Sequence, residues 1–127
     1  MTERSARKIY VLSDAVGETA DAVVRAMPRQ FEGHTIEMKR FGHIKSEEEI
    51  RFIVNEAADG ESFIAYTLVQ PELREMLRME SIRLGIRAVD IMGPMMQAYI
   101  DTFNGSPKSK PGLLHEMDDD YVRRVEA

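Results

Sequence analysis

The sequence alternates four times between a short strand-like apolar run and a longer segment with helical hydrophobic spacing. The strand-like runs lie at residues 8–12, 35–41, 62–69 and 86–92. Each is followed by apolar residues three or four positions apart, which is typical of a helix with one buried face. Parallel strands need such crossovers, and the crossovers are right-handed. We therefore predict an α/β three-layer domain, in which four βα units build a four-stranded, mainly parallel sheet.

Local signals indicate where the helices begin and end. Pro28 cannot donate a backbone hydrogen bond, so we expect the first helix to kink or end there. Ser46 and Glu49 have the spacing of a capping box and predict the start of the second helix. Pro71 suits the first turn of the third helix, and Gly85 suits its end.

Hydrophobic spacing also predicts which side of each helix packs on the sheet. The residues expected to face inward are Ala20, Val23, Val24, Met27 and Phe31 in the first helix, Ile50, Ile53, Val54 and Ala57 in the second, Leu73, Met76, Leu77 and Leu84 in the third, and Met96, Tyr99, Ile100 and Phe103 in the fourth.

The regular alternation ends after the fourth helix. We predict one α/β domain over residues 1–105, followed by a linker over residues 106–120 that is rich in proline, glycine and charge. Residues 121–127 read as the start of another helix, too short to be stable alone. We expect the chain to be the amino-terminal part of a longer protein.

Composition excludes several classes of function. The 127 residues contain no cysteine, so disulfides, thiolate zinc sites and cysteine nucleophiles are ruled out, and we expect a cytoplasmic protein. A net charge of −5 disfavours binding to nucleic acid or to an anionic membrane surface. No apolar run reaches the about 18 residues of a membrane span. The histidines lack metal-ligand spacing, so we expect no metal site.

Ligands of parallel α/β domains collect at the carboxyl ends of the strands. The candidates for ligand or partner binding there are Ser13, Asp14, Gly17, Glu18 and Thr19 after the first strand, Tyr66 and Thr67 in the third, and Asp90 in the fourth. A loop with one glycine that opens a helix can bind an anion through free N–H groups. The alternative is structural, with Ser13 or Asp14 as a helix cap and Gly17 as a turn residue.

Nucleotide-binding motifs are absent from the sequence. No G-x-G-x-x-G follows the first strand, and no G-x-x-x-x-G-K-[ST] occurs anywhere in the chain. From these residues alone, the leading hypothesis is a self-contained α/β module that binds a small anion or phosphate.

Several separate segments, in order, are similar to one bacterial family. These segments are residues 8–20, 63–69 with 71–74, 83–86, 88–90 with 93–94, 111–113, 119–121 and 124–127. They resemble the amino-terminal half of the regulatory proteins of pyruvate, phosphate dikinase and phosphoenolpyruvate synthase.

The resemblance implies a bifunctional serine/threonine kinase and phosphorylase. Such an enzyme inactivates the dikinase or the synthase by ADP-dependent phosphorylation of a threonine. It reactivates its target by phosphate-dependent removal of the phosphoryl group as pyrophosphate. The family's phosphate loop lies in the carboxyl-terminal half, so the resemblance implies that this chain has no catalytic residue and binds neither ADP nor phosphate by itself. The oligomeric state stays open, with a homodimer as a reasonable prior.

Overall fold

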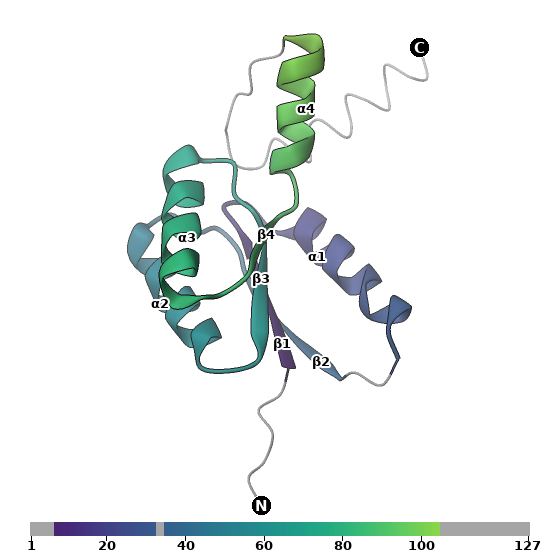
Figure 1. Cartoon of the computed structure of the whole chain (residues 1–127), viewed down its shortest axis with the longest axis vertical. Helices are drawn as coiled ribbons and strands as arrows, with labels where there is room; N and C mark the ends of the chain where they lie inside the picture. Colours follow the sequence, from purple (N-terminus) through teal and green to yellow (C-terminus); the bar gives the residue numbers. More distant parts are fainter. Residues whose placement is uncertain (1–6, 33–34, 105–127) are drawn as a thin grey trace, which may run out of the picture.

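The computed structural model describes residues 7–32 and 35–104, which form four strands that alternate with four helices. Figure 1 shows the strands side by side at the centre. The elements in chain order are β1 (Arg7–Ser13), α1 (Glu18–Ala26), the 3-10 turn η1 (Pro28–Gln30), β2 (Ile36–Phe41), α2 (Glu47–Ala58), β3 (Ser62–Thr67), α3 (Pro71–Leu84), β4 (Ala88–Asp90) and α4 (Gly93–Phe103).

The sheet is parallel throughout, with the strand order β2-β1-β3-β4. The predicted α/β class and parallel sheet are thus confirmed. β2 is an edge strand, and every one of its residues is at least partly accessible. The chain leaves β1 toward β2 and returns to the other side of β1 as β3, so the connections diverge between β1 and β3. In open α/β sheets this is where ligand crevices form.

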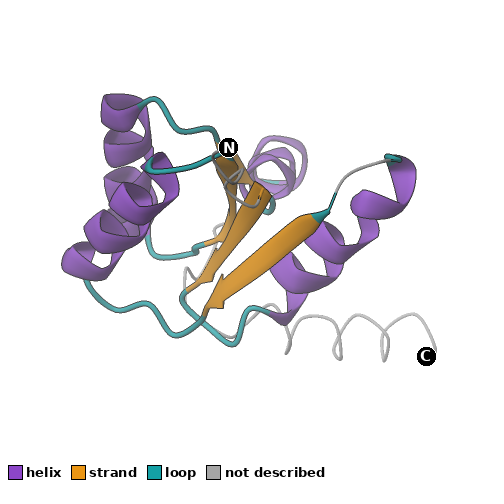
Figure 2. Ribbon diagram, turned by 90° about the horizontal axis from the view of Figure 1, so that it is seen from below, coloured by secondary structure: helices purple, strands orange, loops and turns teal. Residues whose placement is uncertain are grey.

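Helices cover both faces of the sheet, which gives the three layers seen in Figure 2. On one face, α2 and α3 pack over a core that includes Tyr10, Leu12 and Ile64. On the other face, α1 packs Ala20 and Val24 against alternate residues of β1 and β3. Because β1 is central, residues 9–13 are buried on both sides, and this explains its nearly continuous apolar sequence.

The predicted helix signals have clear counterparts. Ser46 Oγ accepts a hydrogen bond from the Glu49 N–H at 3.3 Å and caps α2. The Glu49 carboxylate accepts from the Lys45 N–H at 3.1 Å, one residue before the position expected of a capping box. Pro71 is the first residue of α3, and Gly85 ends that helix with a left-handed φ of 70°. Pro28 follows the end of α1 and opens η1.

The predicted inward residues are confirmed in the second and third helices and only partly in the first. Within α1 the sheet buries Ala20 and Val24. Val23 is 41% exposed, and Met27 and Phe31 lie beyond the helix at 45% and 62% exposure. The apolar spacing overestimated this stripe because α1 ends at Ala26, before Met27 and Phe31 could be placed on its inner side.

The fourth helix also departs from the prediction. α4 buries none of its residues, and Tyr99 and Phe103, which we expected to face inward, are 55% and 67% exposed. Met96 and Ile100 are half-buried. Figure 1 shows α4 beyond the end of the sheet, so the fourth βα unit does not fold back over it.

The predicted domain ends at residue 105, one residue past the described part of the chain. The predicted linker (106–120) and helix start (121–127) lie outside the described residues. Among those that are described, none of the helices combines the length and the apolar character needed to cross a membrane.

Candidate functional site

The loop between β1 and α1 begins with two buried polar residues. Ser13 is 3% exposed and Asp14 is 6% exposed. Ser13 Oγ accepts a hydrogen bond from the Ala15 N–H at 2.9 Å, which tightens the turn that follows β1. The Ser13 hydroxyl is therefore part of the loop's own hydrogen bonding.

Asp14 links the first loop to the loop after β3. Its Oδ2 accepts hydrogen bonds from the backbone N–H groups of Val69 and Gln70, each at 3.0 Å. These N–H groups lie just before α3, where the chain leaves the sheet. Asp14 thus has a structural role at the divergence between β1 and β3. It differs from the structural alternative given from the sequence, because neither Ser13 nor Asp14 caps α1, whose N-cap is Gly17.

Gly17 is the residue before α1 and has a φ of 93°, which favours glycine. It offers no side-chain cap, so the first-turn N–H groups of α1 gain no bond from it. Glu18 is exposed and Thr19 is half-buried in that first turn. Glu18 and Asp21 make the turn acidic, which disfavours an anion there.

Arg40, near the end of β2, lies over this loop and was missed by the sequence analysis. Its Nη2 and Nε donate to the Val16 carbonyl at 2.9 and 3.2 Å, and its Nη1 is 3.9 Å from Asp21 Oδ1. A Cβ on Gly17 would be 3.3 Å from Arg40 Nε. Only the pairing of β2 with β1 brings Arg40 to this loop, so no local pattern in the sequence indicates its position.

The loop after β2 is hydrogen-bonded to the loop after β1. The His43 N–H donates to the Ala15 carbonyl at 2.7 Å, and the Ile44 N–H donates to the Ser13 carbonyl at 3.1 Å. A Cβ on Gly42 would be 3.0 Å from the carbonyl oxygens of Ala15 and Val16, which explains the glycine. His43 has a left-handed φ of 53° and is exposed.

The candidate residues of β3 and β4 lie on two faces of the sheet, Thr67 on one face and Tyr66 and Asp90 on the other. Thr67 pairs in register with Ser13, whereas Tyr66 pairs with Asp90. Tyr66 packs in the core under α2 and α3, so alternation along β3 turns Thr67 toward the α1 side. The structure therefore brings Ser13 and Thr67 together and separates them from Tyr66 and Asp90.

Asp90 fixes the start of α4. Its Oδ1 accepts from the Gly93 N–H at 2.7 Å, and its Oδ2 lies 3.6 Å from Arg74 Nη2 on α3. Burial raises the pKa of the Tyr66 hydroxyl, and the negative charge of Asp90 raises it further. Within the described residues, no three histidine, aspartate or glutamate side chains gather in a way that could hold a metal ion.

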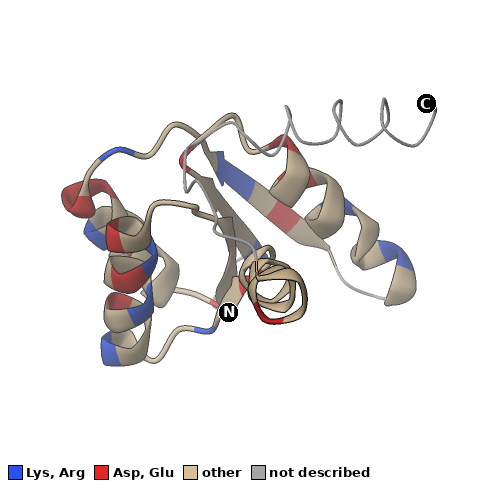
Figure 3. Cartoon of the chain, turned by 90° about the horizontal axis from the view of Figure 1, so that it is seen from above, with Lys and Arg blue, Asp and Glu red and all other residues tan. Residues whose placement is uncertain are grey.

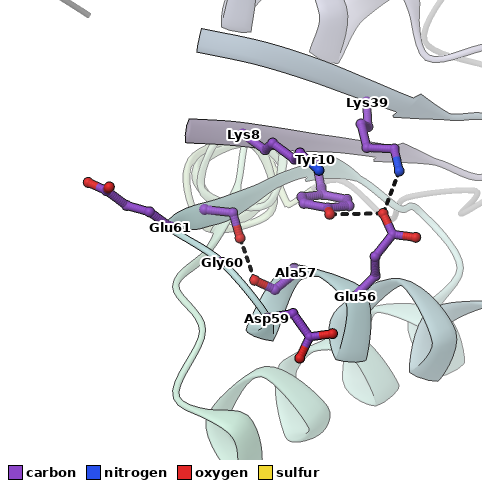
Figure 4. Close-up of a pocket in the computed structure, with 9 residues that line it drawn as sticks. Lys8, Tyr10, Lys39, Glu56, Ala57, Asp59, Gly60 and Glu61 are labelled. Atoms are coloured by element: carbon purple, nitrogen blue, oxygen red, sulfur yellow. Dashed lines mark hydrogen bonds and ion pairs between the residues drawn. The ribbon is translucent and has the colours of Figure 1, made fainter. Parts of the chain in front are cut away.

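A polar hollow lies at the opposite end of the sheet, beside the amino-terminal ends of β1 and β3, and no motif in the sequence indicates it (Figure 4). Tyr10 is 2% exposed, and its hydroxyl donates to Glu56 Oε2 at 2.9 Å. Lys39 Nζ donates to the same oxygen. Burial, together with the bond to Glu56, raises the pKa of Tyr10 to about 12. The bonds from Lys39 and Tyr10 lower the pKa of Glu56.

Comparison with known proteins identifies the family. The model of the family described as "Kinase/pyrophosphorylase" matches residues 9–127. The chain belongs to the kinase/pyrophosphorylase family. A relative from Halothermothrix orenii is 43% identical over 127 residues, which cover all of this chain and 47% of the relative. Its name is "Putative pyruvate, phosphate dikinase regulatory protein".

Two other relatives with the same name show a similar sequence identity and a similar coverage. The relative from Lysinibacillus sphaericus is 44% identical over 123 residues, covering 94% of this chain and 45% of the relative. The relative from Shouchella clausii is 39% identical over 119 residues, covering 94% of this chain and 44% of the relative. The chain spans about half the length of these relatives, and the family resemblance noted from the sequence is confirmed.

Proposed function

We propose that the chain is the recognition domain of a regulatory enzyme that switches pyruvate, phosphate dikinase or phosphoenolpyruvate synthase off and on. The observation that carries this proposal is the family match over residues 9–127, together with the dikinase named in its relatives. The enzyme belongs in the cytoplasm, where both targets would be met.

The proposed reactions are two phosphoryl transfers in opposite directions. In inactivation, a threonine hydroxyl of the target attacks the β-phosphorus of ADP and loses its proton, the bond between the β-phosphorus and the oxygen that bridges it to the α-phosphorus breaks, and AMP leaves. In reactivation, an oxygen of inorganic phosphate attacks the phosphorus on that threonine. The bond between that phosphorus and the threonine oxygen breaks, the threonine oxygen takes up a proton as it leaves, and the pyrophosphate that has formed is released.

Within this enzyme we assign target recognition, and no chemical step, to the present chain. Its sequence contains no phosphate loop of the G-x-x-x-x-G-K-[ST] type, so we place ADP and phosphate binding in the remaining half of the full-length protein. The hydrogen bonds among the loops after β1, β2 and β3 support a rigid contact surface. Ser13 and Gly17 are buried there, so we place the target contact on the accessible residues beside them, such as Glu18 and Thr19.

A label-transfer assay tests whether the chain, which we assign to target recognition, lacks phosphoryl-transfer activity. The chain is mixed with a bacterial pyruvate, phosphate dikinase and ADP labelled at the β-phosphate, and the full-length relative from Halothermothrix orenii serves as the active control. We expect label on the dikinase with the relative and none with the chain alone. Transfer by the chain alone would disprove a recognition-only role, whereas a failure of the relative to label the dikinase would disprove the proposed activity.

A further inference from the structure

α4 has the composition of a covered helix although it is exposed. Among its eleven residues Asp101 is the single charged one, and none is buried. Figure 3 shows α4 almost entirely uncharged, in contrast to the charged outer sides of α2 and α3. A helix without charge on nearly all sides is normally buried against another element. The described residues provide no such cover for α4.

The uncovered side chains of α4 form one stripe, which we call the α4 stripe. It consists of Met95, Tyr99 and Phe103, which are spaced four residues apart and are 63%, 55% and 67% exposed. The rings of Tyr99 and Phe103 contact each other edge to face, with centroids 5.2 Å apart. Asp101 lies about 200° around the helix from Tyr99. There it accepts a hydrogen bond from Gln97 Nε2 at 2.9 Å, so covering the stripe buries no charge of α4.

The order of the three side chains makes the α4 stripe complementary to a second copy of itself. We propose that two copies of the chain associate through their α4 stripes, with the two helices antiparallel about a two-fold axis at Tyr99. Reversing one helix places Met95 beside the partner's Phe103 in two symmetric contacts, and Tyr99 beside the partner's Tyr99. A methionine sulfur beside an aromatic ring is a favourable contact. This inference does not depend on the proposed function.

The absence of charge from the stripe favours a second copy over a different protein. Interfaces between different proteins use complementary charges to fix partner and orientation. Homodimer interfaces are more apolar, and charged residues are depleted at their centres. Ala98 and Thr102 are exposed on the same side of α4 and are also uncharged. Because both are small, they allow the two helices to approach closely.

The available area predicts a weak, reversible dimer. A large side chain of this kind buries about 150–250 Å² when it is fully covered. The three side chains of the α4 stripe are 55–67% exposed, so together they leave roughly 270–450 Å² to be buried on each copy. Ala98 and Thr102 add to this area. The total approaches the roughly 600 Å² per partner at the lower end of specific interfaces, so we expect a micromolar dissociation constant.

Sedimentation equilibrium of the purified chain tests the association, over about 5 to 500 µM, a range that brackets a micromolar dissociation constant. We expect the mean mass to rise with concentration from 14.5 kDa toward twice that value. Tyr99→Asp places a charge at the centre of the α4 stripe and should raise the dissociation constant at least about tenfold. Phe52→Asp is the matched control, because Phe52 is an aromatic residue of α2 that is 65% exposed. It should leave the dissociation constant unchanged.

Cross-linking tests the orientation of the two helices, because the chain has no cysteine of its own. Met95→Cys and Phe103→Cys are purified separately, mixed in equal amounts and mildly oxidised. In the antiparallel pairing the cysteine of one variant lies beside the cysteine of the other. We therefore expect the mixture to form disulfide-linked dimers at least about tenfold faster than either variant alone.

Three results would overturn the proposal. A mass that stays at 14.5 kDa at the highest concentration would show that no second copy covers the stripe. Equal dissociation constants for Tyr99→Asp and Phe52→Asp would place the interface on another surface. Cross-linking of each cysteine variant with itself as fast as with the other would refute the antiparallel pairing. Thermal melting checks that each variant folds, and Met95→Asp replaces Tyr99→Asp if that variant does not.

Discussion

At the scale of single residues, Asp14 holds two loops together through one carboxylate oxygen. Asp14→Ala leaves two backbone N–H groups without their acceptor, so we expect the free energy of unfolding to fall by about 2–3 kcal/mol. Urea denaturation measures this, with Asp101→Ala on the exposed side of α4 as the control, expected within about 0.5 kcal/mol of the parent chain. Equal losses in the two variants would show that Asp14 does not have this structural role.

Glu56 and Tyr10 predict how stability depends on pH. The pKa of Glu56 is lowered in the folded protein. Its contribution to the free energy of unfolding is therefore present above the ordinary carboxyl pKa and is lost as the pH falls through the lowered pKa. The pKa of Tyr10 is raised to about 12, so its contribution is complete below pH about 10 and is lost as the pH rises toward 12.

The variants Glu56→Gln and Tyr10→Phe separate these two effects. Glu56→Gln should cost about 1 kcal/mol at neutral pH, because Glu56 is partly exposed, and this difference should shrink in acid. Tyr10→Phe should remove the alkaline loss that is due to Tyr10. Urea denaturation from pH 3 to 11 measures both, with Glu32→Gln as an exposed control. A difference for Glu56→Gln that grows in acid would contradict the assigned pKa.

At the scale of elements, Gly17 and Arg40 set how α1 meets the sheet. Gly17→Ala adds backbone strain at φ 93° and places a Cβ 3.3 Å from Arg40 Nε. Gly85→Ala is the matched control, because Gly85 also has a positive φ but no atom lies within 4 Å of its Cβ. We expect Gly85→Ala to cost about 1 kcal/mol and Gly17→Ala about 2 kcal/mol. The two substitutions are then measured again in an Arg40→Ala background. There, Gly17→Ala should lower the free energy of unfolding no more than Gly85→Ala does. An unchanged difference between the two would refute the contact with Arg40.

The elements also show what a sequence can predict. Strands, helix starts and the buried side of α2 follow from spacing and caps because these depend on neighbours in the sequence. Spacing indicates that Tyr99 and Phe103 share one side of a helix, but it does not specify what covers them. Asp14 was proposed from the sequence either for a ligand or for a cap. Its bonds to Val69 and Gln70, like the position of Arg40, depend on strand order, which local sequence does not encode.

At the scale of the whole molecule, the charges around the first loop distinguish recognition of a protein from binding of a free anion. Glu18 and Asp21 occupy the first turn of α1, where an anion would otherwise be stabilised. We therefore expect 10 mM phosphate to leave the melting temperature of the chain unchanged at constant ionic strength. Saturable stabilisation by phosphate that is lost in Gly17→Val would instead support the self-contained anion-binding module.

We propose that the loops at the carboxyl ends of the strands recognise the dikinase. Hydrogen exchange of the chain, with and without a bacterial pyruvate, phosphate dikinase, tests it most directly. We predict slower exchange on binding at the amides of residues 15–20 and 42–44, with little change at residues 59–62 beside the polar hollow at the opposite end of the sheet. Unchanged exchange throughout, at concentrations where the full-length relative from Halothermothrix orenii binds, would contradict the claim, and so would protection confined to residues 59–62.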